Sequence, residues 1–315
     1  MNITILDGNA LNPGDLSWEG FFSLGNVTVY PRTEAEALSE RMAESDAILI
    51  NKIQITKDLL NTCPSLKYIG VQATGYNNVD IEECRKRGIT VTNVPSYSSA
   101  SVAQMVFTYI TQWASLSQLH SQSVMEGDWI KSKDFCYWKK TPVELEGKIL
   151  GIFGYGNIGQ KVEQIAKAFG MKILVCTKNP EKHNIKNPSD FEKLLKESDF
   201  LTFHVPLTES TQGIINYENI SKMKKSAYII NTARGGLAKE DEVKKALEEG
   251  LIAGYATDTL IKEPMEPSCP LYKAPNCIIT PHIAWAAKET RKRCLEIAVK
   301  NLEAFIKGQP QNVVS

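Results

Sequence analysis

A glycine-rich turn between a short apolar run and an amphipathic stretch constrains the fold of this chain more than any other feature. The run spans 149–153, the turn reads Gly154-Tyr-Gly156-Asn-Ile-Gly159, and a second apolar run follows at 172–176. Between the two runs, helical spacing puts one apolar stripe on Ile158, Val162, Ile165, Ala166 and Phe169, and the stripe stops at Gly170. We therefore predict a strand, a helix and a second strand.

The three glycines suit this turn for different physical reasons. They allow a tight turn, a close approach of the backbone to a pyrophosphate, and close packing of the helix on the strand. The helix N-terminus also offers unpaired N–H groups and a partial positive charge to phosphates. A glycine turn alone could be an ordinary loop, but strand, turn, helix and strand in this order predict dinucleotide binding. The expected contacts are Gly154, Tyr155, Gly156, Asn157, Ile158 and Gly159.

Short apolar runs alternate with helical patterns along the rest of the chain. The further strands are expected at 3–6, 27–30, 47–50, 68–71 and 90–94, and again at 200–205, 227–231, 252–257 and 277–280. The helices are expected at 34–45, 56–62, 79–86, 190–197, 217–222, 240–249 and 288–306. Strands that alternate with helices predict an α/β protein with parallel sheets. A length of 315 residues suggests two domains of about 150 residues each.

Composition argues against several classes of protein. The 36 Lys and Arg residues balance the 36 Asp and Glu residues, so no basic face is expected for nucleic acid or an anionic membrane. The seven cysteines form no C-x-x-C pair, which favours reduced thiols in a cytoplasmic protein over disulfides or a metal site. No basic region followed by an apolar segment opens the chain, so we expect no signal peptide.

Residues 91–125 contain no Asp, Glu, Lys or Arg, yet they do not fit a membrane span. Ser, Thr and Gln interrupt the stretch, whereas a span needs about 20 predominantly apolar residues. We expect a helix over 99–120 that is buried between domains or subunits. An irregular, aromatic-rich segment with Trp129 and Trp138 follows. We interpret it as an arm against a partner subunit or across a cleft.

Polar residues stand where several of the expected strands end, which is where parallel sheets bind ligands. In the first part of the chain, Asn51 and Lys52 follow one strand and Thr74-Gly75 follow another. The backbone N–H groups of Thr74 and Gly75 could bind an anion, although a simple turn is an equal alternative.

In the second part, three strand ends should deliver Arg234, Glu263 and His282 to one sheet edge. Taken singly, they could be a surface arginine, a solvated loop acid and a structural histidine. Together they suit proton transfer, because a carboxylate can hold a histidine in one tautomer and favour its charged form while an arginine binds a substrate anion.

The ordered motifs resemble the D-isomer-specific 2-hydroxyacid dehydrogenase family over nearly the whole chain. They are Gly75-x-x-x-Val79-Asp80, the glycine turn, His204-Val-Pro206-Leu-Thr208, Asn231-Thr-Ala-Arg234-Gly-Gly236, Glu263-Pro264 and Thr280-Pro-His282. Three further segments are similar to its glycerate dehydrogenase (hydroxypyruvate reductase) branch, namely Asp128-Trp129, Phe135-Cys-Tyr137-Trp138 and His282-Ile-Ala-Trp285.

This resemblance implies two doubly wound parallel-sheet domains with a cleft between them. A flavodoxin-like substrate domain would comprise residues 1–98 and 284–315, and a Rossmann NAD(P)-binding domain would comprise residues 99–283. The resemblance also implies a homodimer formed through residues 99–145.

The resemblance assigns roles to single residues. His282 would protonate the carbonyl oxygen as hydride reaches the carbon, and Glu263 would pair with His282 and favour its charged form. Arg234 would hold the substrate carboxylate. The other implied substrate contacts are Asn51, Lys52, Thr74, Gly75 and Trp285, with Trp285 narrowing the pocket toward a short substrate. The further cofactor contacts would be Val205, Pro206, Thr232, Ala233 and Asp258. No metal is implied.

One departure concerns the choice of dinucleotide. In NAD-specific members an acid about 20 residues past the glycines binds the ribose 2′-OH. Here the second strand runs into Thr177-Lys178-Asn179, and no acid occurs before Glu181. Thr177 and Lys178 could accept a 2′-phosphate, which favours NADP. Alternatively, Lys178 points to solvent and NAD binds without the carboxylate.

We expect a cytoplasmic oxidoreductase that interconverts a small D-2-hydroxy acid and its 2-keto acid with NAD or NADP. D-glycerate and hydroxypyruvate are the first expectation, and D-lactate or glyoxylate/glycolate are alternatives within the family. The alternative of another class is a nucleotide-sensing protein similar to the corepressors built on this fold. Turnover of a short 2-keto acid separates the two.

Overall fold

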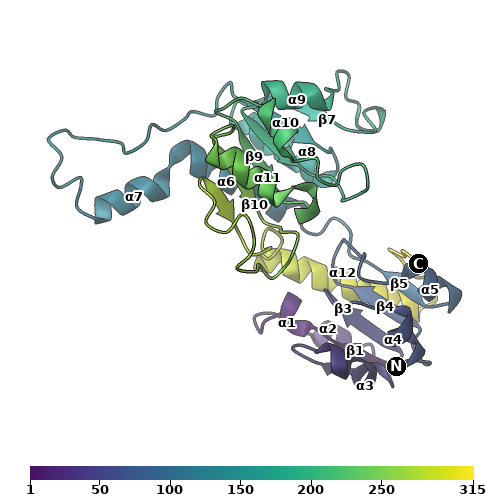
Figure 1. Ribbon diagram of the computed structural model, residues 1–315. Helices are drawn as coiled ribbons and strands as arrows, with labels where there is room; N and C mark the ends of the chain where they lie inside the picture. The colour runs from purple at the N-terminus through teal and green to yellow at the C-terminus, as the bar shows by residue number, and fades with distance from the viewer. The chain divides into compact units, whose positions relative to one another are not determined.

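The computed structural model describes residues 1–315, which divide into two compact units. The first unit comprises Met1–Ser98 and Trp285–Ser315, and the second comprises Ser99–Ala284. Each unit is built on its own parallel sheet with helices around it (Figure 1). The division expected after residue 98 coincides with the bound at Ser98. The division expected after residue 283 lies one residue before the bound at Ala284.

The first unit has a five-stranded parallel sheet in the order β2-β1-β3-β4-β5. The strands are β1 (Asn2–Ile5), β2 (Asn26–Val29), β3 (Ala47–Ile50), β4 (Tyr68–Val71) and β5 (Thr90–Thr92). The helices are α1 (Gly8–Leu11), α2 (Glu19–Phe22), η1 (Ala35–Ala37), α3 (Leu38–Met42), α4 (Lys57–Asn61), α5 (Ile81–Lys86) and α12 (Lys288–Ile306). Strands β3 and β4 are buried along their whole length, because hydrophobic clusters cover both faces of the sheet.

Helix α12 brings the C-terminal part of the chain back onto this first sheet. Its buried residues Cys294, Leu295, Ala298 and Leu302 join the cluster on one face. The Asn301 side chain donates to a backbone oxygen next to β5 at 2.9 Å. The first unit is therefore assembled from both ends of the chain.

The second unit has a six-stranded parallel sheet in the order β11-β10-β9-β8-β6-β7. The strands are β6 (Ile149–Phe153), β7 (Lys172–Cys176), β8 (Phe200–Phe203), β9 (Tyr228–Asn231), β10 (Gly254–Thr257) and β11 (Cys277–Ile279). The helices are α6 (Ser99–Ser115), α7 (Ser117–Met125), α8 (Asn157–Ala168), η2 (Glu181–His183), α9 (Phe191–Glu197), α10 (Tyr217–Ser221), η3 (Gly235–Leu237) and α11 (Glu240–Glu248). Strand order reverses between β6 and β8, and ligands bind at such reversals in doubly wound sheets.

Three sequence-based expectations about helices were wrong. The single helix expected over 99–120 is broken at Leu116, whose φ of +53° is left-handed and cannot continue an α-helix. The buried stripe of α6 also ends there, at Ala114, whereas α7 buries only Ser123. Phe169 was expected on the buried stripe of α8, but it caps the end of that helix and is 43% exposed.

The helix expected over 34–45 was also too long. The structure has the short turn η1 followed by the five-residue helix α3 there. Elsewhere the expected strands and helices are present, with ends shifted by a few residues.

Beyond α7, the chain runs out from the second sheet as an extended segment and then returns to β6 (Figure 1). This segment carries large apolar side chains that are more than half exposed. They are Trp129, Ile130, Phe135 and Trp138.

Candidate active site

The glycine turn after β6 shows a separate steric reason for each glycine. Gly154 has φ +99°, and a Cβ there would lie 2.5 Å from the His204 backbone oxygen. A Cβ on Gly159 would lie 2.4 Å from the Gly154 oxygen. A Cβ on Gly156 would meet no atom within 4 Å. The first and third glycines are therefore required by packing, whereas the second leaves open space at the N-terminus of α8, as a phosphate requires.

Other residues at this sheet edge also fit a dinucleotide. Val205 packs against the turn, because its Cγ1 would lie 2.6 Å from a Cβ on Gly154. Pro206 follows it in the exposed loop after β8. Thr232, at the end of β9, has a buried hydroxyl that makes no hydrogen bond within the protein. An unpaired buried hydroxyl is costly, so a ligand that hydrogen-bonds Thr232 would relieve that cost.

His204 belongs to the same edge but does not suit proton transfer. Its Nε2 lies 2.9 Å from the Thr202 hydroxyl, and burial lowers the pKa of His204 to about 3. The ring is therefore neutral at physiological pH. This leaves His282 as the candidate acid at this edge.

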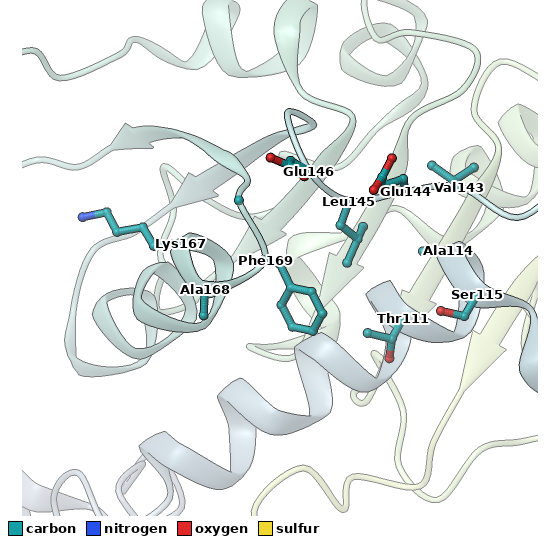
Figure 2. A pocket seen from close by; sticks show the side chains of 11 residues that line it. Thr111, Ala114, Ser115, Val143, Glu144, Leu145, Glu146, Lys167, Ala168 and Phe169 are labelled. Atoms are coloured by element: carbon teal, nitrogen blue, oxygen red, sulfur yellow. The ribbon is translucent and has the colours of Figure 1, made fainter.

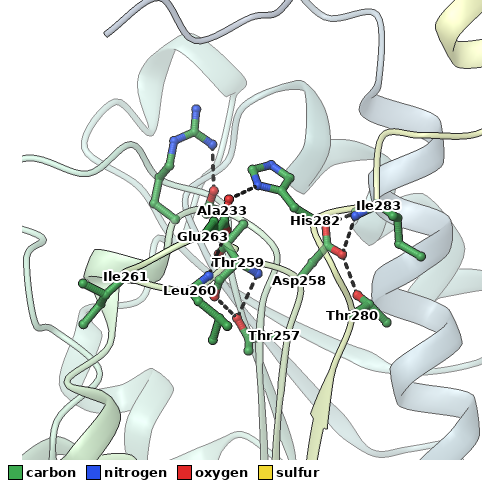
Figure 3. Close-up of polar contacts among 12 residues, drawn as sticks. Ala233, Thr257, Asp258, Thr259, Leu260, Ile261, Glu263, Thr280, His282 and Ile283 are labelled. Atoms are coloured by element: carbon green, nitrogen blue, oxygen red, sulfur yellow. Dashed lines mark hydrogen bonds and ion pairs between the residues drawn. The ribbon is translucent and has the colours of Figure 1, made fainter. Parts of the chain in front are cut away.

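His282 and Glu263 are brought together by the loops that follow β11 and β10 (Figure 3). The His282 Nδ1 lies 2.7 Å from Glu263 Oε2. Glu263 Oε1 accepts a hydrogen bond from the Leu260 N–H at 2.9 Å, which fixes the carboxylate. A carboxylate at Nδ1 keeps that nitrogen protonated, and it leaves Nε2 to exchange a proton with a substrate.

The backbone at His282 is held in an uncommon conformation by Asp258. His282 has φ +55°, and a left-handed non-glycine residue costs about 1–3 kcal/mol. The Asp258 carboxylate accepts the Ile283 N–H at Oδ1 and the Ala284 N–H at Oδ2, both at 2.8 Å. Hydrogen bonds from N–H groups to a carboxylate are among the stronger ones. Asp258 therefore stabilises the turn that presents His282.

Asp258 is itself almost fully buried, at 1% exposure. Burial raises its pKa, and this is opposed by the hydrogen bonds from Thr280 and the two backbone amides and by the charge of His282. The resemblance to the dehydrogenases implies a cofactor contact for Asp258, and its structural role was missed. The position of Asp258 directly after an apolar strand was the available signal.

Arg234 follows β9, the neighbour of β10 in the sheet. Its Nη1 donates to the Ala233 oxygen at 2.7 Å and its side chain is exposed. The Asn231 side chain fixes the backbone here, because its amide donates to the Arg234 oxygen and its oxygen accepts the Ala233 N–H. Arg234 therefore lies at the edge that carries Glu263 and His282.

Thr177 and Lys178 follow β7, which pairs with β6 beside the glycine turn. The Thr177 hydroxyl accepts the Asn179 N–H at 3.4 Å, and Lys178 Nζ lies 3.4 Å from the Ser210 hydroxyl. Glu181, the first acid after β7, opens η2. The end of β7 thus presents a cation and a hydroxyl.

The first unit has its own polar strand ends. The backbone N–H groups of Thr74 and Gly75 make no hydrogen bond within the protein, although the Thr74 hydroxyl donates to the Val94 oxygen. Asn51 is 3% exposed, and its amide donates to the Gln72 oxygen at 2.9 Å, so it fixes this edge. Lys52 is exposed.

Sequence reasoning missed Asp7, which follows β1 at the same edge as Asn51. Its carboxylate accepts the Asn51 N–H at 2.9 Å and the Lys52 N–H at 2.8 Å. An acid directly after an apolar run was the available signal. Trp285, which lies shortly before α12, is half-buried. Its ring packs edge-on against Tyr97, with 6.4 Å between the ring centroids.

A pocket of about 560 Å³ lies elsewhere in the second unit (Figure 2). Thr111 and Ser115 of α6, residues 143–146 and residues 167–170 line it. Its place is the C-terminal end of α8, whereas the glycine turn is at the N-terminal end of that helix. The pocket is therefore separate from the chemistry of Glu263 and His282.

No group of three or more His, Cys, Asp or Glu side chains is arranged to hold a metal ion. All seven cysteines are free thiols, of which Cys63, Cys84 and Cys294 are buried and Cys136 is exposed. None of the helices combines the length and the apolar character needed to cross a bilayer.

Comparison with known proteins identifies the class. Residues 107–284 match the family model described as D-isomer specific 2-hydroxyacid dehydrogenase, NAD binding domain. The chain is 43% identical over 322 residues to a hydroxypyruvate reductase of Blautia hydrogenotrophica, with all of both chains covered. It is 40% identical over 281 residues to a glycerate dehydrogenase of Methylorubrum extorquens, covering 89% of this chain and 88% of that one.

Solved structures agree with this result. An NADPH-dependent glyoxylate/hydroxypyruvate reductase from Sinorhizobium meliloti, in complex with NADP and malonate, is similar with a TM-score of 0.83 and 26% identity, covering 100% of this chain and 96% of that one. A D-lactate dehydrogenase from Aquifex aeolicus, complexed with NAD and lactic acid, is similar with a TM-score of 0.82 and 28% identity, covering 98% and 96%.

The chain belongs to the D-isomer specific 2-hydroxyacid dehydrogenase family. It is an oxidoreductase that transfers hydride between NAD or NADP and a D-2-hydroxy acid or its 2-keto acid. The resemblance to the glycerate dehydrogenase and hydroxypyruvate reductase branch is confirmed. The alternative of a nucleotide-sensing corepressor is not favoured.

Proposed function

We propose that the substrate pair is hydroxypyruvate and D-glycerate, and that His282 is the proton donor and acceptor. The observation that carries the catalytic assignment is the 2.7 Å contact between His282 Nδ1 and Glu263 Oε2. The substrate is supported by the two relatives at 43% and 40% identity, which are named for these compounds. Trp285 is proposed to favour a short substrate.

A dinucleotide held at the glycine turn would supply the hydride for reduction of the keto carbon. His282 donates the proton on Nε2 to the carbonyl oxygen, so that the carbonyl becomes a hydroxyl group. Glu263 stabilises the charged ring before the transfer and keeps Nδ1 protonated after it. Arg234 binds the substrate carboxylate with its planar guanidinium. Orientation of this kind can lower a barrier by up to about 7–11 kcal/mol.

We propose further anion contacts from the N–H groups of Thr74 and Gly75 and from the exposed Lys52. Asn51 is proposed to hold that edge in shape. The dinucleotide contacts proposed in the second unit are the glycine turn with Tyr155, Asn157 and Ile158, and also Val205, Pro206, Thr232, Ala233 and Asp258. We accordingly propose residues 1–98 with 284–315 as the substrate domain and residues 99–283 as the NAD(P)-binding domain.

We infer a preference for NADP over NAD. Support comes from Lys178 and the Thr177 hydroxyl at the end of β7, where no acid stands before Glu181. Thr177→Asp should shift the ratio of kcat/KM values toward NAD, because a carboxylate repels a 2′-phosphate and accepts a hydrogen bond from a 2′-OH. Steady-state kinetics with both cofactors measure the ratio. An unchanged ratio would show that the end of β7 does not contact the 2′ position.

We also propose a homodimer formed through residues 99–145, and a place in the cytoplasm. The exposed aromatic side chains beyond α7 support the dimer. The seven free cysteines suit a reducing compartment.

A panel of hydroxypyruvate, glyoxylate and pyruvate, each assayed with NADH and with NADPH, tests the substrate. The highest kcat/KM is expected with hydroxypyruvate. A higher value with pyruvate or glyoxylate would favour the alternative substrates D-lactate or glycolate. Absence of turnover with all three would overturn the proposed function.

A further inference from the structure

Two side chains outside the proposed catalytic group form a hydrogen-bonded chain to the loop that carries His282. Tyr109 lies on α6 and is 1% exposed. Its hydroxyl oxygen lies 2.5 Å from the Thr280 hydroxyl oxygen, although 171 residues separate them in sequence. The Thr280 hydroxyl in turn donates to Asp258 Oδ1 at 2.5 Å (Figure 3). The chain therefore ends on the carboxylate that holds the His282 turn.

The direction of these hydrogen bonds follows from chemistry. An ionised Asp258 can only accept, so the Thr280 hydroxyl donates its one proton to it. The Thr280 oxygen then has lone pairs left, and Tyr109 must donate to it. Burial, together with the nearby charge of Asp258, raises the pKa of Tyr109, so the phenol keeps its proton at physiological pH. Every member of the chain thus has one defined role.

The same helix holds the loop at a second point. The Ser101 hydroxyl of α6 donates to the Ala284 oxygen at 2.6 Å. Ala284 also donates its N–H to Asp258 Oδ2. The segment on either side of His282 is thereby tied to α6 through Thr280 before the histidine and through Ala284 after it.

We propose that Tyr109 and Thr280 are positioning residues for proton transfer, which act through Asp258 to hold His282 in its left-handed turn. Neither side chain is proposed to touch substrate or cofactor. This inference rests on the proposed role of His282. Substitution of Tyr109 or Thr280 should therefore affect the rate of the chemical step more than substrate binding. The positions of Arg234 and the glycine turn do not depend on these two side chains.

Thr280→Val removes the hydroxyl and keeps the shape, and Thr280→Ser keeps the hydroxyl. Misplacement of a reacting group can cost up to about 100-fold, so we expect Thr280→Val to lower kcat about 10- to 100-fold. The KM for hydroxypyruvate should change little. Thr280→Ser should restore most of the lost kcat. Tyr109→Phe removes one hydrogen bond and should lower kcat by about 3- to 10-fold.

The kcat of the double variant shows whether Tyr109 and Thr280 act through one series of hydrogen bonds or independently. Because Tyr109 acts only through Thr280, Tyr109→Phe with Thr280→Val should be no slower than Thr280→Val alone. Hydrogen exchange of the Ile283 and Ala284 amides gives a readout without turnover, and exchange should be faster in Thr280→Val. Tyr68→Phe is the matched control, because Tyr68 is also fully buried and bonded to a threonine, Thr92, at 2.6 Å. It lies in the first unit and should leave kcat unchanged.

Several outcomes would overturn the inference. It fails if Tyr109→Phe and Thr280→Val keep the kcat of the unmodified enzyme while His282→Ala is inactive. It also fails if Thr280→Ser is as slow as Thr280→Val, since a hydroxyl group at this position would then not restore kcat. If Thr280→Val does not fold, the kcat of Tyr109→Phe and the exchange of its Ile283 and Ala284 amides test the inference instead. If His282→Ala remains active, the proposed function itself fails, and the inference falls with it.

Discussion

At the scale of single residues, the two histidines of the sheet edge are set apart by their surroundings. His282 faces a carboxylate, Glu263, that is fixed by a backbone N–H. His204 faces a neutral hydroxyl, and burial lowers its pKa to about 3. The surroundings of His282 therefore suit the proposed proton transfer, whereas the neutral ring of His204 suits packing beside the glycine turn.

His204 should make the protein less stable in mild acid. The unfolded chain binds a proton at this histidine below pH 6.5, whereas the folded protein does not until about pH 3. The free energy of unfolding therefore decreases as pH falls from 6.5 toward 3. At pH 5 the decrease due to His204 is about 2 kcal/mol. His204→Gln keeps a nitrogen near Thr202 and cannot titrate. Urea unfolding at pH 7.5 and pH 5 should show a smaller loss in the variant, and an equal loss would contradict the assignment.

Sequence reasoning reached the residues that follow strands, because polar side chains after apolar runs mark the edge of a parallel sheet. It did not reach the partners of Asp258. Tyr109 is an apolar-stripe residue of a helix, and nothing in its local pattern shows that its hydroxyl meets Thr280. Such a contact depends on how α6 packs against β11, which periodicity does not encode.

At the scale of elements, the β6–α8 connection shows how three glycines divide the work. Packing against His204 and against Gly154 itself excludes side chains at the first and third positions. The middle position is open and extended, with φ −79°. Such a position tolerates a side chain in the absence of ligand. Within this one turn, the first and third glycines are therefore needed for folding, and the middle glycine is expected to matter for ligand binding.

Gly156→Ala should therefore weaken dinucleotide binding at little cost to folding. The added methyl group would occupy the space in which a phosphate approaches the backbone. We expect the Kd for NAD(P)H to rise at least about tenfold, equivalent to about 1.4 kcal/mol, with the melting temperature of the free protein unchanged. Gly159→Ala is the comparison, and it should lower the melting temperature because its Cβ would overlap the Gly154 oxygen. An equal decrease of the melting temperature in both variants would contradict these separate roles of the two glycines.

Element ends were less predictable than element positions. The expected helix over 99–120 missed the break at Leu116, because its residues have ordinary helix propensities on both sides. The break follows from tertiary burial, since α6 packs against the second sheet whereas α7 is mostly exposed. Strands, in contrast, were found readily because β8 and most of β6 are buried and consist mainly of apolar residues.

At the scale of the whole molecule, the chain keeps two separate sheets, and the N-terminal sheet is completed by the C-terminal helix α12. The expectation of two domains followed from length and from the alternation of strands and helices. The return of α12 to the first sheet came only from the family resemblance, since nothing in the residues of α12 names its partner. The exposed segment beyond α7 likewise reads as irregular by sequence alone.

That segment should decide the oligomeric state. Ile130 and Phe135 are 90% and 89% exposed, and burial of such side chains against a second copy would stabilise a dimer. Ile130→Asp with Phe135→Asp should convert a species of twice 35.1 kDa into one of 35.1 kDa by light scattering. Tyr272→Asp is the control, because Tyr272 is 47% exposed outside the segment. A dimer that survives the double substitution would place the interface elsewhere.

The central claim is that His282 transfers the proton that accompanies hydride transfer, and His282→Ala tests it most directly. With hydroxypyruvate and the preferred cofactor, the substitution should lower kcat by at least about 100-fold, because general acid catalysis typically contributes about 10²–10⁴-fold. The Kd for NAD(P)H should stay nearly the same, since we propose that the dinucleotide binds at the glycine turn. A His282→Ala enzyme with the kcat of the unmodified protein would contradict the account.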